Sequence, residues 1–226
     1  MRALHFMKID YVKTKQQMLL TPLILLLVVV IMMVPDSDIR DYSAVVPFAY
    51  MVFMMIIFSC SPFGTCRREE TGFLQLLPAT TYERVAGRFL YGISLLVIAA
   101  ALGAGAMAVF RMFGFQNSAL DIPLCLVVLA IGIFIMTAEY VFFYLFGENT
   151  AQNLLGIIRV IPGMCFFFIT ANVSKEIMKE PEKLQQFMET VGRNLNLIGG
   201  IALAASLVMF VAAIGLCAAI TDKRDC

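Results

Sequence analysis

The sequence predicts an all-α integral membrane protein with six transmembrane helices. Of its 226 residues, 61% are hydrophobic and only 15% are charged. Soluble domains average roughly 45 to 50% apolar and about 25% charged residues, so the excess of apolar side chains indicates lipid contact. The sequence contains six apolar runs, and a hydrocarbon core of about 30 Å needs about 20 residues of helix per crossing.

The predicted spans follow one another along the whole chain. They are Met18 to Val34, Ser43 to Gly64, Phe89 to Phe110, Ile122 to Phe146, Leu154 to Val173 and Leu197 to Ile220. The first follows the polar residues 1–17 and ends in Met-Val-Pro-Asp. Because this ending lacks a small-x-small cleavage site, we expect a retained span and not a cleaved signal peptide.

Small residues recur four positions apart in two of these spans. Ala99 and Gly103 form one such pair, and Gly200 and Ala204 form another. Such pairs let helix backbones approach closely, so they favour compact packing or a dimer contact.

The distribution of lysine and arginine predicts the orientation. With the amino terminus inside, eleven of the 17 basic residues lie on the inner side. Positive charge is retained on the cytoplasmic side of short loops. We therefore expect both termini inside (N-in/C-in), with residues 1–226 forming a single transmembrane domain.

Residues 1–17 are predicted to form a helix in the inner membrane interface. Leu4, Met7, Tyr11 and Met18 recur at helical spacing, and lysines occupy positions between them. This pattern is typical of a helix whose apolar side enters the lipid while its lysines lie near anionic headgroups. The alternative is a basic tail that only orients the first span.

A second helix is predicted in the outer segment Ser174 to Asn196, between the fifth and sixth spans. After Pro181, a plausible first helical residue, apolar side chains recur at Leu184, Phe187, Met188 and Val191. This spacing indicates an amphipathic helix of about three turns. It would cap the spans or lie on the outer leaflet.

Composition excludes several functions. A net charge of +1 leaves no basic field for nucleic acid. With a single histidine, His5, and six cysteines that form no C-x-x-C pair, a zinc site or H-E-x-x-H peptidase is excluded. The cysteines are expected to be buried free thiols. The phosphate-binding pattern G-x-x-x-x-G-K-[ST] is absent, so this chain is not expected to hydrolyse ATP.

The inner loop between spans two and three, residues 65–88, carries the most specific pattern. Pro78 divides it into two short helical pieces. The first piece has an apolar face of Phe73, Leu76 and Leu77. In the second, Thr80 and Glu83 have the spacing of a capping box. On these features alone, a charged docking surface and a mere connector are equally compatible with the loop.

This loop resembles that of ABC-2 type permeases. The family pattern is an acidic pair, a glycine followed by apolar residues, Leu-Leu-x-x-Pro or Leu-Pro, a hydroxyl residue, a basic residue, and Gly-Lys at the start of span three. The matching residues here are Glu69, Glu70, Gly72, Leu76, Leu77, Pro78, Thr80, Thr81, Arg84, Gly87 and Arg88. The chain departs from the pattern at Tyr82, where a basic residue is usual, and at Arg88, where lysine is usual.

The resemblance extends to the whole plan of spans, interfacial helix and outer segment. It implies an export permease of a bacterial cell membrane, similar to the small permeases that export amphipathic peptides such as phenol-soluble modulins. The implied partners are a separate ATPase that binds ATP and magnesium, and a second permease that is a copy or a paralogue. The implied ATPase-coupling residues are Glu69, Glu70, Gly72, Phe73, Leu76, Leu77, Pro78 and Arg84.

Charged and polar residues inside the spans are candidates for translocation or gating. Glu139 is the only acid in a predicted span, and an ionised acid at mid-bilayer costs about 2.5 to 3.5 kcal/mol unless it faces the bundle or water. Tyr140 is its neighbour, Arg159 in the fifth span is a possible ion-pair partner, and Asn172 lies near the outer end. The alternative roles are packing for Glu139 and snorkelling for Arg159.

Two functions from other classes remain open at this stage. An intramembrane enzyme would need paired acids, a serine with histidine, or metal ligands at membrane depth, and only Glu139 is found there. No catalytic, cofactor-binding or metal-binding residue is therefore predicted in this chain. The second alternative is a substrate-binding membrane subunit without the ABC-2 fold.

Overall fold

The structure is a computed structural model and describes residues 3–12, 14–15, 45–64, 79–112, 121–147, 150 and 181–225. Within these ranges every regular element is a helix. The labelled helices are α2 (Val45–Ser59), α3 (Ser61–Gly64), α5 (Thr81–Met112), α6 (Asp121–Phe146) and α8 (Pro181–Asp225). Residues 3–12 and 14–15 are also helical, and we call them the amino-terminal helix. The prediction of an all-helical protein is confirmed for this part of the chain.

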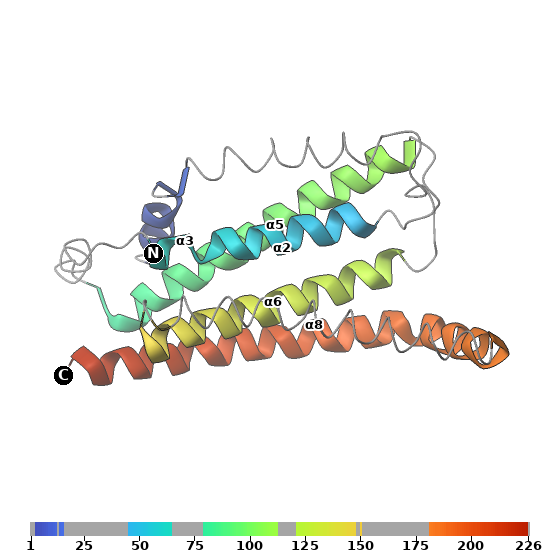
Figure 1. The fold of residues 1–226 in the computed structure, drawn as a ribbon. Coiled ribbons are helices and arrows are strands. Elements are labelled where there is room, and N and C mark those ends of the chain that lie inside the picture. Colours follow the sequence, from blue (N-terminus) through green and yellow to red (C-terminus); the bar gives the residue numbers. More distant parts are fainter. Residues whose placement is uncertain are drawn as a thin grey trace.

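The long helices pack as two pairs, one above the other (Figure 1). α2 packs chiefly against α5, and α6 packs chiefly against α8, while α2 also contacts α6 and α5 also contacts α8. The amino-terminal helix, α3, the start of α5 and the end of α8 lie at one end of the bundle, which we call the terminal end. An even number of spans places both termini on the same side of the membrane. The amino-terminal helix and the end of α8 lie at the same end of the bundle.

Three of the described helices are long and apolar enough to cross a membrane. They are Thr81–Val109, Asp121–Phe146 and Asn194–Lys223, and they match the predicted third, fourth and sixth spans, with Phe110 of the third lying one residue beyond Val109. The predicted second span corresponds to α2 and α3, whose apolar stretch Pro47–Phe63 is shorter. The predicted first and fifth spans lie outside the described residues. The protein is therefore a multi-pass membrane protein, and the total of six spans stays a prediction.

Close packing uses some of the small residues that the sequence singled out. Ala99 is fully buried, and a Cβ on Gly103 would lie 2.8 Å from the Phe48 ring. Gly103 therefore lets α5 approach α2 closely. Gly200 and Ala204 are exposed instead. Their neighbour Gly199 makes the contact with α6, where an added Cβ would lie 3.2 Å from the Cβ of Leu126.

α8 begins at Pro181, the residue predicted to start the outer helix. It continues without interruption for 45 residues to Asp225. At about 1.5 Å per residue this helix is about 68 Å long, more than twice the hydrocarbon thickness. The expected short outer helix is therefore the first part of a single helix that also forms the last span.

The amino-terminal helix is turned differently from the prediction. Phe6 is buried, and Met7 and Tyr11 pack against the core of the bundle. Leu4 is 49% exposed. The apolar stripe predicted to enter lipid thus mostly faces protein, because the helix docks on α5.

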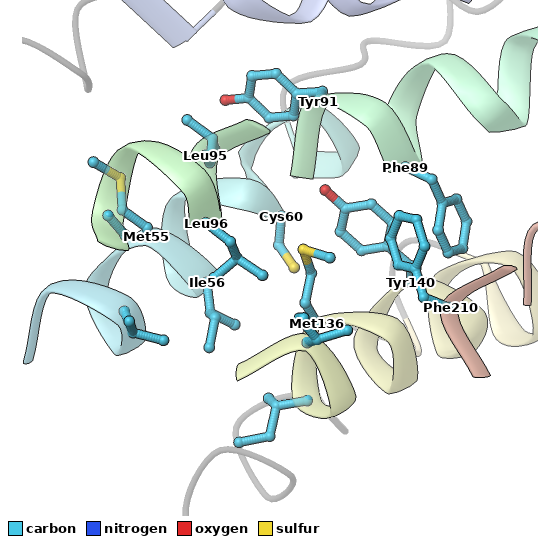
Figure 2. Close-up of a cluster of buried hydrophobic side chains, with 14 of the residues drawn as sticks. Met55, Ile56, Cys60, Phe89, Tyr91, Leu95, Leu96, Met136, Tyr140 and Phe210 are labelled. Carbon is cyan, nitrogen blue, oxygen red and sulfur yellow. The ribbon is translucent and has the colours of Figure 1, made fainter. Parts of the chain in front are cut away.

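The buried core gathers side chains from four helices (Figure 2). Those that are almost inaccessible to solvent include Met55, Ile56, Phe89, Leu95, Leu96 and Met136. Phe210 of α8 joins them, with its ring 5.3 Å from the Phe89 ring. At the terminal end this apolar core adjoins a group of buried polar side chains.

Candidate functional site

The second predicted span is interrupted near the terminal end. α2 ends at Ser59, and α3 begins at Ser61. Pro62 has no backbone N–H, so it cannot donate to the carbonyl of Phe58 one turn earlier. The Ser59 hydroxyl donates to the Ile56 carbonyl at 2.7 Å, a local bond that competes with regular helix. Pro62 and Ser59 together account for the interruption, which we call the α2 break.

The α2 break leaves a carbonyl group that α6 satisfies. In a regular helix the Phe63 N–H would donate to the Ser59 carbonyl, but it donates to the Cys60 carbonyl at 3.1 Å. The Tyr140 hydroxyl of α6 instead donates to the Ser59 carbonyl at 2.8 Å. Since both groups are buried, this bond replaces the hydrogen bond lost from the helix.

Glu139, the residue before Tyr140, binds the next residue of the α2 break. The Cys60 thiol donates to its Oε2 atom at 2.7 Å. Glu139 and Tyr140 are both fully buried. Two successive residues of α6 therefore hold two successive residues of α2. A carboxyl group buried this deeply in a span is a candidate functional group by its cost alone.

α5 leaves room for this contact at Gly92. A Cβ at that position would lie 2.6 Å from the Tyr140 hydroxyl oxygen and 2.7 Å from the Met136 sulfur. The Phe89 ring, one turn earlier, meets the Tyr140 ring edge-on with 5.0 Å between centroids, and Figure 2 shows these two side chains next to each other. Three helices thus meet at Tyr140, and any side chain at Gly92 would displace its hydroxyl.

α3 is held by aromatic contacts. The Phe63 ring stacks on Phe143 with 4.4 Å between centroids, and it meets Tyr140 and Tyr144 edge-on. The Arg88 guanidinium of α5 lies over the Phe63 ring, 4.6 Å from its centroid, a cation–π arrangement. Arg88 therefore joins α5 to α3.

The start of α5 is capped as the sequence predicted. The Thr80 hydroxyl accepts the Glu83 N–H at 3.2 Å, and the Glu83 carboxylate accepts the Thr80 N–H at 3.1 Å. These reciprocal bonds satisfy two backbone donors that a helix start leaves without partners. The Thr81 hydroxyl also donates to Asp222 of α8 at 3.3 Å. The first turn of α5 is therefore tied to the last turns of α8.

A family model described as an ABC-2 family transporter protein matches residues 6–221. The chain belongs to the ABC-2 transporter family. This membership makes it a membrane permease component of an ABC transporter, in the role of a transport subunit. No curated protein and no solved structure matches the chain.

In this ABC-2 permease, only part of the predicted coupling segment falls within the described residues. Arg84 lies in the first turn of α5, is half-buried, and donates to the Ala79 carbonyl at 3.4 Å. The other predicted coupling residues lie outside the described residues. They are Glu69, Glu70, Gly72, Phe73, Leu76, Leu77 and Pro78. Their role stays a prediction.

The predicted gating residues divide in the same way. Glu139 and Tyr140 lie together at the α2 break, whereas Arg159 and Asn172 lie outside the described residues. Thr137 donates to the Ile133 carbonyl at 2.7 Å. Within the described ranges, no three His, Cys, Asp or Glu side chains are grouped so that they could hold a metal ion.

Sequence reasoning missed the partners of Glu139 and Tyr140 in this permease. The sequence predicts one continuous span through Ser59 and Cys60, whereas their contacts with α6 join residues about 80 positions apart. Pro62 inside an apolar run was the available signal, because a proline there predicts a break whose carbonyl groups need partners.

Proposed function

We propose that this ABC-2 permease is the membrane-spanning subunit of an ATP-driven exporter in a bacterial cell membrane. Its cargo is hydrophobic or amphipathic, peptides included. Two permeases, identical or paralogous, work with two ATPase subunits that bind ATP and magnesium. The family membership over residues 6–221 is the observation that carries the proposal.

The loop of residues 65–88 docks on the ATPase from the cytoplasmic side in this proposal. Support comes from both flanks of the loop. On one side, Phe63 of α3 is packed among Phe143, Tyr140 and Tyr144. On the other side, α5 starts with the Thr80–Glu83 capping box. Because the residues at both ends of the loop have fixed contacts, a displacement of the loop is transmitted to the helix bundle.

The contacts at the α2 break give a route for that displacement. A movement of α3 acts on α6 through Phe63 and through the bonds from Glu139 and Tyr140 to the α2 break. A movement of the α5 start acts on α8 through Thr81 and Asp222. ATP-driven closure of the ATPases would thus reorient both helix pairs and open an outward path. Glu139 and Tyr140 gate that path, with Arg159 and Asn172 as further candidates.

Co-purification with the ATPase tests the proposal. If Leu76 and Leu77 fill a groove on the ATPase, burial of each contributes about 1.5 to 3 kcal/mol. The double variant Leu76→Asp, Leu77→Asp should therefore remain inserted but lose the ATPase. Asn194→Asp, Asn196→Asp is the matched control, since both asparagines are exposed on α8, and it should retain the ATPase.

Unchanged ATPase binding and transport in the leucine double variant would remove this loop as the docking site. A wild-type permease that never co-purifies with an ATPase would overturn the proposal of ATP-driven export.

A further inference from the structure

The amino-terminal helix presents two distinct faces. Phe6, Asp10 and Thr14, each four residues apart, are buried. Leu4, Lys8 and Val12 have the same spacing on the opposite side, and Lys15 follows; all four are exposed, Val12 to 75%. Residues four apart share one side of a helix. We call Leu4, Lys8, Val12 and Lys15 the outward face.

The helix is fixed in place by its inward face. The hydroxyls of Tyr11 and Ser94 share a hydrogen bond of 2.8 Å, and those of Thr14 and Tyr91 share one of 2.7 Å. Figure 2 shows Tyr91 at the edge of the hydrophobic cluster. At Gly87 the two helices touch so closely that a Cβ would lie 2.6 Å from the Cβ of Phe6. The orientation of the outward face is therefore set by the fold.

The contacts on α5 give the depth of the helix in the membrane. The candidate span Thr81–Val109 has 29 residues, about 43 Å, which exceeds the hydrocarbon core by about 13 Å. Most of this excess lies at the start of α5, because the charged residues there end at Arg88, and the core boundary therefore lies near Arg88, about 10 Å beyond Thr81. Gly87 and Ser94 lie about 9 and 20 Å beyond Thr81. The docked helix, which lies beside the start of α5 in Figure 1, thus reaches from the lipid headgroups into the acyl chains.

The chemistry of the outward face fits that depth. Leu4 and Val12 are aliphatic, and Lys8 and Lys15 have long stems that carry their ammonium groups toward the surface of the bilayer. Within residues 3–12 and 14–15 no acidic side chain is exposed. A face that is aliphatic and purely basic at the headgroup level complements an anionic phospholipid.

We propose that the outward face binds anionic phospholipids, with Lys8 and Lys15 contacting lipid phosphates and Leu4 and Val12 lying among acyl chains. The bound lipids hold the amino-terminal helix against α5 at Gly87. This residue directly precedes Arg88, which contacts Phe63 of α3. Anionic lipid thereby stabilises the region that, in the proposed function, couples the permease to an ATPase. The lipid site itself depends only on the spans crossing a membrane.

The absence of tryptophan from the chain permits a direct test on the permease alone. The Val12→Trp variant places one fluorophore on the outward face. It is reconstituted in nanodiscs of phosphatidylcholine and phosphatidylglycerol, with one or the other lipid brominated at equal mole fraction. We expect brominated phosphatidylglycerol to quench more strongly, with a local enrichment on the order of tenfold from two lysines.

Charge variants in the Val12→Trp background assign the effect to the lysines. Lys8→Gln, Lys15→Gln should abolish the preference for phosphatidylglycerol. Lys223→Gln, at an exposed position near the end of α8, is the control and should retain the preference. If Val12→Trp does not fold, Leu4→Trp serves as the probe on the same face.

Three outcomes would overturn the proposal. They are equal quenching by the two brominated lipids, a preference that survives loss of both lysines, and quenching by aqueous iodide but by neither lipid. Since the measurement needs no ATPase, failure here leaves the transport function untouched.

Discussion

Glu139 has a defined partner at the residue scale, the thiol of Cys60. Two roles follow from this contact. If Glu139 only accepts a hydrogen bond, an amide oxygen of the same shape serves equally well. If its charge is used during transport, the amide does not, because only the carboxyl group changes protonation or forms an ion pair. The two roles are separated by a substitution that keeps the size of the side chain.

We predict that Glu139→Gln folds normally but lowers transport and substrate-stimulated ATPase activity. A loss of roughly tenfold corresponds to about 1.4 kcal/mol on the barrier. The control is Thr137→Val, which removes a buried hydroxyl of the same helix but leaves the carboxyl group and its contact with Cys60, and it should transport nearly as well as the wild type. Both variants are measured in proteoliposomes at matched permease levels. Wild-type activity of Glu139→Gln would make Glu139 a packing residue.

Residue chemistry explains which parts of the site could be predicted. Glu139 was identified because an acid in an apolar run is costly, and the Thr80–Glu83 cap was identified because its bonds are local. The partners Ser59 and Cys60 could not be found in this way, since their contacts with α6 depend on how distant helices cross. The same limit applies to Tyr11 and Thr14, whose bonds to α5 turn the predicted lipid-facing stripe toward protein.

At the element scale, hydropathy predicted the apolar middle of each described span but not the full helix. α6 runs from Asp121 to Phe146, close to the prediction, because Asp121 directly precedes the apolar run. α5 begins eight residues before its predicted apolar run (Phe89 against Thr81), since a capped polar turn extends the helix beyond that run. α8 extends even further, because nothing in residues 181–196 breaks the helix.

The cap of α5 gives a prediction at this scale. Thr80→Ala removes the acceptor for the Glu83 N–H, a loss of about 1 kcal/mol for a typical N-cap. We expect a slightly lower midpoint of thermal unfolding in detergent and weaker coupling of the ATPase, with ATPase binding retained. Thr80→Ser keeps the hydroxyl and should behave as the wild type. Identical unfolding midpoints for the alanine and serine variants would show that the cap does not stabilise the start of α5.

At the scale of the whole molecule, the contacts fix which parts share an end of the bundle but not which end faces the cytoplasm. The Thr81–Asp222 bond places the start of α5 and the last turns of α8 together. At the other end, Arg111 of α5 pairs with the buried Asp121 of α6 at 3.2 Å. The excess of lysine and arginine near the terminal end favours the cytoplasm for that end.

Single cysteines in a background without the six native ones test this orientation. Met112 at the end of α5 is 86% exposed. We predict that Met112→Cys and Gln185→Cys react with a membrane-impermeant maleimide from outside sealed cells. Gln75→Cys and Lys223→Cys should react only after permeabilisation. The Met112 and Lys223 variants test the two ends of the described bundle, and Gln75 tests the loop. Labelling of Gln75→Cys in sealed cells would place the loop outside, where no ATP-binding partner could dock on it, and would overturn the proposed coupling.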